Sequence, residues 1–193
     1  MPDLIFSGAI LAGGRSSRMG RDKAFLPIAS QSLIARQSAL LRSLGTDDLI
    51  ISGRPNTDYA IPDARIVHDS IADAGPLAGL VAVLSAARHP WVLVIAVDLP
   101  RLDATFLNRL LAQGGGRTGV VPYGPRGYEP LAALYPRALL PEAETALRDG
   151  EFALHTLIES AQHLGLIRPL PLDEEDVPLL TNWNSPEDTP SAL

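Results

Sequence analysis

The 193-residue sequence contains no cysteine, so disulfide bonds, thiolate metal sites and thiol nucleophiles are all excluded. Histidine is scarce as well, and the four histidines do not fall at spacings that hold zinc. The chain lacks any run of about 18 apolar residues, and it lacks a basic segment followed by an apolar one and a cleavage site. We therefore expect no membrane span and no secretory signal, and a cytoplasmic location.

Basic residues are also few, with 16 Lys and Arg against 22 Asp and Glu, which gives a net charge of −6. A general nucleic-acid binder carries a broad basic surface, so this balance argues against nucleic acid as a partner. The hydrophobic fraction of 46% and the charged fraction of 20% are ordinary for a soluble globular protein. Because no repeat or linker interrupts the chain, we expect a single domain over residues 1–193.

Short apolar runs alternate with helical patterns in the first hundred residues. The predicted strands are Ala9–Leu11, Leu49–Ser52, Ile66–His68 and Val92–Val97, and the predicted helices are Ser32–Leu44 and Leu77–Arg88. The last strand is apolar at every position, as expected of a strand buried on both faces. The order β-α-β-β-α-β predicts an α/β fold of three layers, with helices on both faces of a mostly parallel, twisted sheet. Ligands of such sheets bind outside the carboxyl ends of the strands.

The second half of the chain shows weaker patterns. Its predicted helices are Ala104–Ala112, Ala138–Asp149 and Phe152–His163, and its predicted strands are Gly119–Pro122 and Leu131–Tyr135. From Pro169 onward the chain is rich in proline and acidic residues. We expect this tail to wrap the surface, with a short strand near Leu179–Thr181.

The segment GAILAGGRSSRMGRDKA begins with the first predicted strand and continues into a glycine-rich and basic stretch. Its four basic residues are Arg15, Arg18, Arg21 and Lys23. Glycines such as Gly13 and Gly14 allow a concave turn in which several backbone amides face one anion, and basic side chains can then close around it. The spacing fits neither the dinucleotide-binding pattern G-x-G-x-x-G nor the P-loop, because Ala24 follows Lys23. The alternative is a tight strand-to-helix turn with solvated loop charges.

A carboxylate stands directly beyond the most apolar predicted strand. The segment VLVIAVDLP places Asp98 at the ligand edge of the sheet, and Pro100 prevents a simple continuation of the strand. Magnesium in phosphate chemistry is commonly held by one or two carboxylates, with water and substrate oxygens in the other positions. The alternative role, capping the helix that begins near Ala104, suits Asp103 better. Asp98 is therefore the candidate metal ligand and catalytic residue.

The segment LAGGRSSRMGRDKA resembles the signature loop of the molybdenum cofactor guanylyltransferases, within the nucleotidyltransferases related to sugar-nucleotide pyrophosphorylases. Four further segments match the family in order: DLP after Val97, GPLAG at Gly75–Gly79, YEPLAALYP at Tyr128–Pro136 and NWNSPED at Asn182–Asp188. The resemblance implies a Rossmann-like nucleotide-diphospho-sugar transferase fold. It also implies transfer of GMP from GTP to molybdopterin with Mg²⁺, giving molybdopterin guanine dinucleotide and pyrophosphate. Because the product is destined for molybdoenzymes, the resemblance also implies molybdoenzyme apoproteins and their chaperones as partners of the protein.

The same resemblance implies roles for individual residues. Nucleotide contacts are expected from Leu11, Ala12 and Gly13, and phosphate contacts from Gly14, Arg18 and Lys23, with Arg18 near the reacting phosphates. Further nucleotide contacts are expected from Ser52, Asp69 and Gly75, and Asn182 and Asn184 would lie near the pterin or the metal. Without the resemblance, Asp69 reads as a turn or cap residue, Glu129 as a strand-edge charge, and Asn184 as the start of a turn.

Several alternatives stay open at the level of sequence. The cytidylyltransferase of the same pterin tends to have LAAG where this chain has LAGG, so Gly13 favours GTP over CTP. Another nucleotidyltransferase and a non-catalytic nucleotide-binding protein are the more distant alternatives. The chain departs from the family pattern after Gly150, where Glu151, Phe152 and Ala153 replace an expected basic residue.

Overall fold

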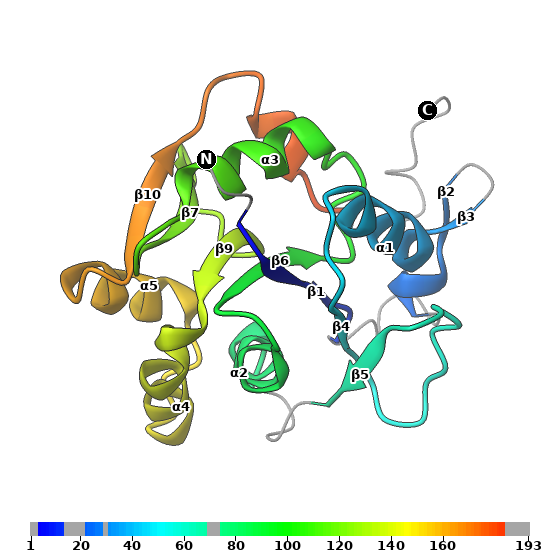
Figure 1. Ribbon diagram of the computed structural model, residues 1–193, viewed down its shortest axis with the longest axis horizontal. Coiled ribbons are helices and arrows are strands. Elements are labelled where there is room, and N and C mark those ends of the chain that lie inside the picture. Colours follow the sequence, from blue (N-terminus) through cyan, green and yellow to red (C-terminus); the bar gives the residue numbers. More distant parts are fainter. Residues whose placement is uncertain (1–3, 14–21, 29–30, 69–73, 184–193) are drawn as a thin grey trace.

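The computed structural model describes residues 4–13, 22–28, 31–68 and 74–183, and Figure 1 shows their arrangement. The parallel centre of the sheet consists of β5 (Arg65–Val67), β4 (Leu49–Ser52), β1 (Phe6–Leu11) and β6 (Trp91–Ala96), in this spatial order. Within β1, Ala9 lies opposite Ile50 of β4 on one side and Val94 of β6 on the other. The predicted β-α-β-β-α-β order of the first hundred residues is thus confirmed.

The sheet continues beyond β6 with mixed strand directions. β9 (Ala132–Pro136) runs antiparallel to both β6 and β7 (Gly119–Gly124), and β10 (Ile167–Pro171) runs parallel to β7. The short strand β8 (Gly127–Tyr128) forms a hairpin with β7. The resulting order β10-β7-β9-β6-β1-β4-β5 is a mostly parallel sheet, as predicted.

Helices cover both faces of this sheet, which gives the predicted three layers (Figure 1). One face carries α1 (Leu33–Ser43) and α3 (Ala104–Gln113), and the other carries α2 (Pro76–Ala86), α4 (Leu140–Arg148) and α5 (Leu154–His163). Because side chains alternate along a strand, Leu93 of β6 joins the first core and Val94 the second. Every residue of β6 is buried, which explains why this strand lacks polar positions.

The helix starts follow local hydrogen bonding. At the start of α1, the Ser32 hydroxyl accepts a hydrogen bond from the Ala35 amide. At the start of α3, the Asp103 carboxylate accepts a hydrogen bond of 2.8 Å from the Phe106 amide. Asp103 is therefore the cap of α3, and Asp98 is left for another role. At the start of α2, Gly75 has a φ of 67°, a backbone conformation that favours glycine, and Pro76 takes the first helical position.

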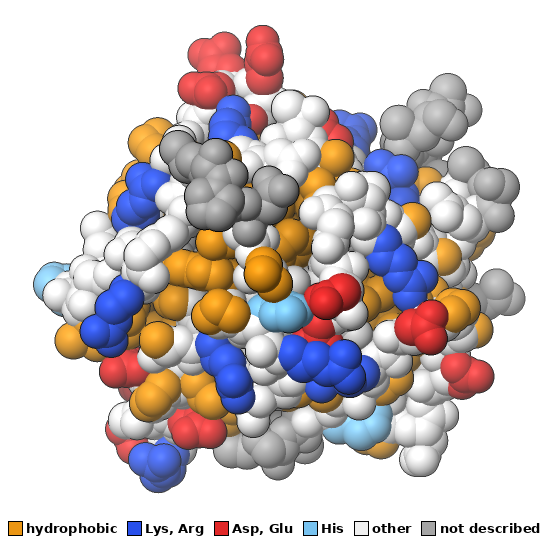
Figure 2. All heavy atoms as spheres, viewed as in Figure 1, with side chains coloured by type: hydrophobic (Ala, Val, Ile, Leu, Met, Phe, Trp, Pro, Cys, Tyr) orange, Lys and Arg blue, Asp and Glu red, His pale blue; other side chains and the backbone are white. Residues whose placement is uncertain are grey.

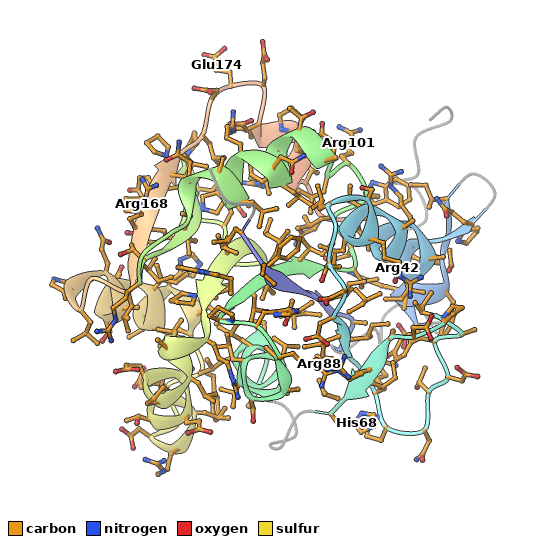
Figure 3. The ribbon with its side chains drawn as sticks, in the orientation of Figure 1. Arg42, His68, Arg88, Arg101, Arg168 and Glu174 are labelled. Atoms are coloured by element: carbon orange, nitrogen blue, oxygen red, sulfur yellow. The ribbon has the colours of Figure 1, made fainter. Side chains whose placement is uncertain are left out.

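The C-terminal part differs from the sequence prediction. The prediction of a strand near Leu179–Thr181 is wrong, because Val177–Leu180 forms a 3-10 helix. The strand of this region is instead β10, which contains two prolines and lies at the edge of the sheet, where a missing amide donor is tolerated. Acidic side chains gather over the loop that follows β10, at the top of the molecule, where Glu174 is labelled (Figures 2 and 3). Within the described ranges, no helix is long and apolar enough to cross a membrane.

Candidate active site

Three parallel strands end side by side at one edge of the sheet. Leu11, the last residue of β1, lies opposite Ser52 at the end of β4 and opposite Ala96 at the end of β6. Sequence reasoning proposed Leu11, Ser52 and the segment after β6 as parts of one site, and the strand register brings all three to the same edge.

The first amides after β1 are bonded to the neighbouring strand. The amides of Ala12 and Gly13 both donate to the Ser52 carbonyl oxygen, at 2.8 and 3.1 Å. On the other side, the Val97 amide donates to the Leu11 carbonyl oxygen at 3.1 Å. These bonds fix the beginning of the glycine-rich segment against β4 and β6. The sequence predicts nucleotide contacts from Ala12 and Gly13, and in the structure the backbone amides of both residues are already bonded to Ser52.

A lysine and a carboxylate meet just beyond this edge. The Nζ atom of Lys23 lies 3.1 Å from Oδ2 of Asp98, although the two residues are 75 positions apart in the sequence. Lys23 opens the short 3-10 helix Lys23–Phe25, whose start is capped by Asp22. The side chains of Lys23 and Asp98 are 19% and 18% exposed, so both are sheltered and yet accessible to a ligand.

The end of the described chain lies against the segment that carries Asp98. The backbone amide of Trp183 donates to the Asp98 carbonyl oxygen at 2.9 Å, and the Trp183 side chain is buried in the core. This contact holds the exposed neighbour Asn182 close to Asp98. The other residues that the sequence assigned to the site, Gly14, Arg18, Asp69 and Asn184, lie outside the described residues.

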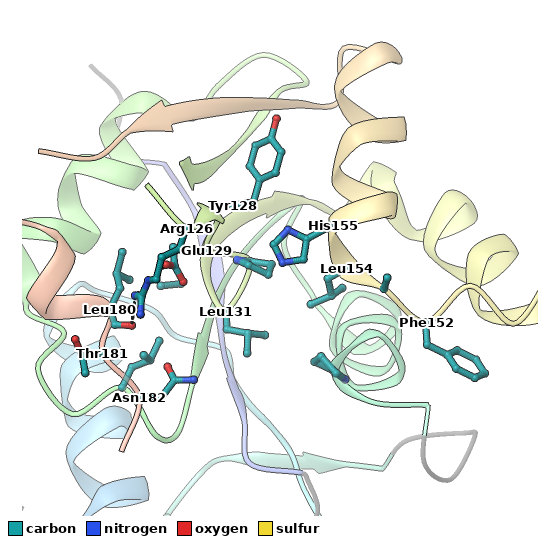
Figure 4. Close-up of a pocket in the computed structure, with 15 residues that line it drawn as sticks. Arg126, Tyr128, Glu129, Leu131, Phe152, Leu154, His155, Leu180, Thr181 and Asn182 are labelled. Carbon is teal, nitrogen blue, oxygen red and sulfur yellow. Dashed lines mark hydrogen bonds and ion pairs between the residues drawn. The ribbon is translucent and has the colours of Figure 1, made fainter. Parts of the chain in front are cut away.

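A pocket of about 680 Å³ opens beside the Asp98 segment, and Figure 4 shows its labelled lining residues. Its walls contain Leu99 next to Asp98, Pro76 at the start of α2, and Asn182 from the tail. A volume of this size is typical of small-molecule sites. Three of the motifs singled out in the sequence, VDLP, GPLAG and NWN, therefore contribute to one pocket.

The opposite walls of the pocket come from the β8 region and from the start of α5. Arg126 donates to Glu129 at 3.1 Å, and Figure 4 shows these two side chains next to each other. Tyr128, His155 and Phe152 complete this part of the lining, and Phe152 lies at the opposite end from Thr181 and Asn182. The motif YEPLAALYP contains both Tyr128 and Glu129, and Phe152 lies in the segment that departs from the family pattern, whereas no motif includes Arg126 or His155.

The described part of the chain contains no group of three His, Cys, Asp or Glu side chains that could hold a metal. Among these residues, a cation at Asp98 would therefore have a single carboxylate ligand. Magnesium accepts such a site, because it keeps several waters and binds substrate phosphates in its remaining positions. The residues present thus fit a magnesium ion that is shared with a nucleotide.

An α/β sheet with a glycine-rich sequence after β1 and a carboxylate after β6 is the arrangement expected of a nucleotidyltransferase. Residues 8–164 match the family model of the MobA-like NTP transferase domain. The "Probable molybdenum cofactor guanylyltransferase" of Opitutus terrae is 38% identical, and the alignment covers 94% of this chain and 92% of the relative. The "Molybdenum cofactor guanylyltransferase" of Pseudomonas aeruginosa strain PAO1 is 42% identical over 92% and 89% of the two chains. The chain belongs to the molybdenum cofactor guanylyltransferase family.

Solved structures show the same fold at lower identity. The "Molybdopterin-guanine dinucleotide biosynthesis protein A" of Archaeoglobus fulgidus superimposes with a TM-score of 0.75 at 21% identity, covering 95% of this chain and 94% of the neighbour. This likeness extends the agreement in fold to nearly the whole chain.

Proposed function

We propose that this protein transfers GMP from GTP to molybdopterin, forming molybdopterin guanine dinucleotide and pyrophosphate. The observation that carries the proposal is the pair formed by Lys23 and Asp98, 3.1 Å apart, next to Leu99 in the pocket wall. A nucleotidyl transfer needs a place for a triphosphate, a place for an acceptor, and charged groups between them. The names of the relatives supply the identity of the two substrates.

The nucleotide side of the site lies at the ends of β1 and β4. In this proposal, Leu11, Ala12, Gly13 and Ser52 contact the nucleoside. The triphosphate then extends toward Lys23, where Gly14 and Arg18 complete its binding site. Asp69 and Gly75 add contacts from the segment before α2.

The acceptor side is the pocket beyond Asp98. Its apolar walls, with Leu131, Leu154 and Phe152, suit the flat ring system of a pterin. Asn182, in the proposal together with Asn184, stands where the acceptor phosphate would approach the nucleotide. The carboxylate of Glu129 is unsuited to a phosphate, so the phosphate end of the acceptor is directed toward Asn182 and Lys23 instead.

The proposed chemistry requires charge compensation rather than a protein base. A phosphate monoester has a second pKa of about 6, so the attacking phosphate is already anionic at neutral pH. Lys23 would lower the repulsion between the two polyanionic substrates and align the α-phosphate for attack. Asp98 would hold a divalent cation, which we propose to be Mg²⁺, and this cation when bound would neutralise phosphate oxygens. A neighbour of this fold, Rv0371C of Mycobacterium tuberculosis, is described as a complex with manganese.

The proposal is tested by incubating the protein with molybdopterin, Mg²⁺ and each of the four nucleoside triphosphates. The expected result is a dinucleotide of the mass of molybdopterin guanine dinucleotide, formed from GTP alone. A product from CTP alone would identify the cytidylyltransferase alternative, and no product from any nucleotide would refute the proposal. A cytoplasmic location and transfer of the product to molybdoenzyme apoproteins or their chaperones belong to the same proposal.

A further inference from the structure

Helix α1 touches both segments that form the charged pair. At its start, the Leu33 amide donates to the Leu26 carbonyl oxygen at 3.0 Å, directly after the 3-10 helix that carries Lys23. One turn later, α1 faces the segment that carries Asp98. The helix therefore supports two side chains that the sequence places far apart.

The contact with the Asp98 segment is made by Gln37, a fully buried side chain in the middle of α1. Its Nε2 atom donates to the Leu99 carbonyl oxygen at 2.7 Å and lies 3.5 Å from the Ala96 carbonyl oxygen. Next to it, Arg36 donates through Nε to the Pro100 carbonyl oxygen at 2.8 Å. The carbonyl groups on both sides of Asp98 are thus bonded to one helix.

The tail completes this arrangement, because the Trp183 amide bonds the carbonyl oxygen of Asp98 itself. The backbone of the segment is consequently held by Gln37, Arg36 and Trp183, while the Asp98 carboxylate projects toward Lys23. A backbone fixed at successive carbonyls has little freedom to move the side chain between them.

The bonding of Gln37 is costly for the core. Its Oε1 atom is buried and has no hydrogen-bond partner within the described part of the chain. A buried polar atom without a partner destabilises the folded state, and an apolar side chain of similar size would avoid this cost. The core does not require a polar side chain at this position, and Gln37 is bonded to the segment that carries Asp98. We therefore expect Gln37 to contribute to the site.

We propose that Gln37 is a positioning residue, which holds the Leu99 carbonyl so that the Asp98 carboxylate stays in place for a divalent cation. This inference rests on the proposed function, because it takes Asp98 as the group that binds the cation. Gln37 itself touches neither substrate nor cation. Gln37 acts on the Asp98 side chain through the backbone, because it bonds the carbonyl oxygen of Leu99, the residue that follows Asp98.

The test replaces Gln37 by Met, which keeps the length of the side chain but removes both polar atoms. We expect the melting temperature to change by less than about 4 °C or to rise, because the lost bond to Leu99 is offset by the removal of the unpaired Oε1 atom. We expect Mn²⁺ affinity, measured by electron paramagnetic resonance, to fall about tenfold, and kcat to fall about tenfold with the KM for GTP unchanged. Gln37→Leu is the second variant, in case the Met variant packs poorly.

The neighbouring residue provides a matched control. Ser38 is also buried in α1, and its hydroxyl has no hydrogen-bond partner in the residues that the structure describes. Ser38→Ala therefore removes a buried polar atom from the same helix without removing a bond to the Asp98 segment. We expect this variant to keep the Mn²⁺ affinity and kcat of the unmodified protein.

Two results would overturn the proposal. If both Gln37 variants keep the Mn²⁺ affinity, Gln37 is a structural residue, whatever their stability. If Ser38→Ala loses as much Mn²⁺ affinity as Gln37→Met, the effect belongs to the helix and not to Gln37. Failure of the proposed function is distinguishable, because it would show as absence of nucleotidyl transfer by the unmodified protein, while the Mn²⁺ comparison still tests Gln37.

Discussion

The amino ends of the parallel strands form one edge of the central sheet and the carboxyl ends form the opposite edge. Each of these two edges carries a sheltered aspartate, and the two carboxylates are bonded very differently. At the amino edge, Asp48 precedes β4 and its side chain is 1% exposed. It accepts hydrogen bonds from the Ser7 hydroxyl at 2.6 Å, the Arg65 guanidinium at 2.6 Å and the Arg88 amide at 3.0 Å. At the carboxyl edge, Asp98 is 18% exposed, and Lys23 is the only described side chain that bonds its carboxylate.

This difference separates a structural charge from a charge available to ligands. Burial raises the pKa of Asp48, but the bonds from Ser7, Arg88 and Arg65 lower it by more, so the net pKa lies below its ordinary value. The carboxylate of Asp48 is fully used within the protein, and Figure 3 shows Arg88 near the ends of β4 and β5. The carboxylate of Asp98 is partly exposed and so is accessible to a ligand. Substitutions at the two edges should therefore separate activity from stability.

The largest effect on activity is expected for Asp98→Ala. Guanylyl transfer should fall by about 1,000-fold, because the group proposed to hold the cation is removed from the reacting phosphates. The melting temperature should stay close to that of the unmodified protein, since Asp98 is not part of the core. Steady-state turnover and a thermal melt check both parts, and near-normal turnover would remove Asp98 from the site.

The largest effect on stability is expected for Asp48→Asn. The free energy of unfolding should fall by about 3 kcal/mol, because the variant leaves Arg65 without its buried partner. Turnover per folded molecule should stay unchanged, since Asp48 lies at the opposite edge from the proposed site. Denaturant titration measures the loss, with Asp47→Asn as control, because Asp47 is 78% exposed and its pairing contributes little. An equal loss in both variants would contradict the structural role of Asp48.

A smaller effect is expected for Lys23→Ala, which removes the positive charge proposed to bind the phosphates of GTP. The affinity for GTP, measured by calorimetry, should fall about tenfold, in line with the loss of one charge-assisted hydrogen bond. Arg148→Ala is the control, because Arg148 is an exposed cation at the end of α4, away from the site. Unchanged GTP affinity in Lys23→Ala would exclude Lys23 from the phosphate site.

The smallest effect concerns pH. Because the pKa of Asp48 is lowered on folding, the folded state favours its ionised form, and the resulting stabilisation is present above the ordinary value of 3.8. It should be lost as the pH falls through the lower pKa of the folded state. The stability difference between the unmodified protein and Asp48→Asn should therefore shrink as the pH falls below 3.8. A difference that stays constant with pH would show that the ionisation of Asp48 does not contribute to the stability of the fold.

The central sheet could be predicted because its sequence pattern and its burial agree. The uniformly apolar run at Val92–Val97 and the helix predicted over Ser32–Leu44 correspond closely to β6 and α1. The strand β10 could not be found, because Pro169 and Pro171 argue against a strand unless it is known to lie at the edge of a sheet. Edge position is a property of the assembled sheet and is not visible in the local sequence.

The residues of the site also divide into those that the sequence indicates and those that only the folded structure reveals. Asp98 stands out because a charged residue directly after an apolar run breaks the local pattern, and Lys23 because it belongs to the basic, glycine-rich segment that resembles the family's signature loop. Gln37 and Arg126 could not be found in this way, because a polar residue within a helix or a hairpin reads as a solvent-facing position. Their significance comes from tertiary contacts with the carbonyl oxygens of Leu99 and Leu180, which no spacing rule predicts.

The most direct test of the central claim is the yield of dinucleotide from GTP and molybdopterin, measured by mass spectrometry for three proteins in parallel. The unmodified protein and Asp48→Asn should form the product at equal rates per folded molecule, and Asp98→Ala should form almost none. If the unmodified protein forms no product, or if Asp98→Ala is no slower than Asp48→Asn, then the carboxyl edge of the sheet is not the site of guanylyl transfer.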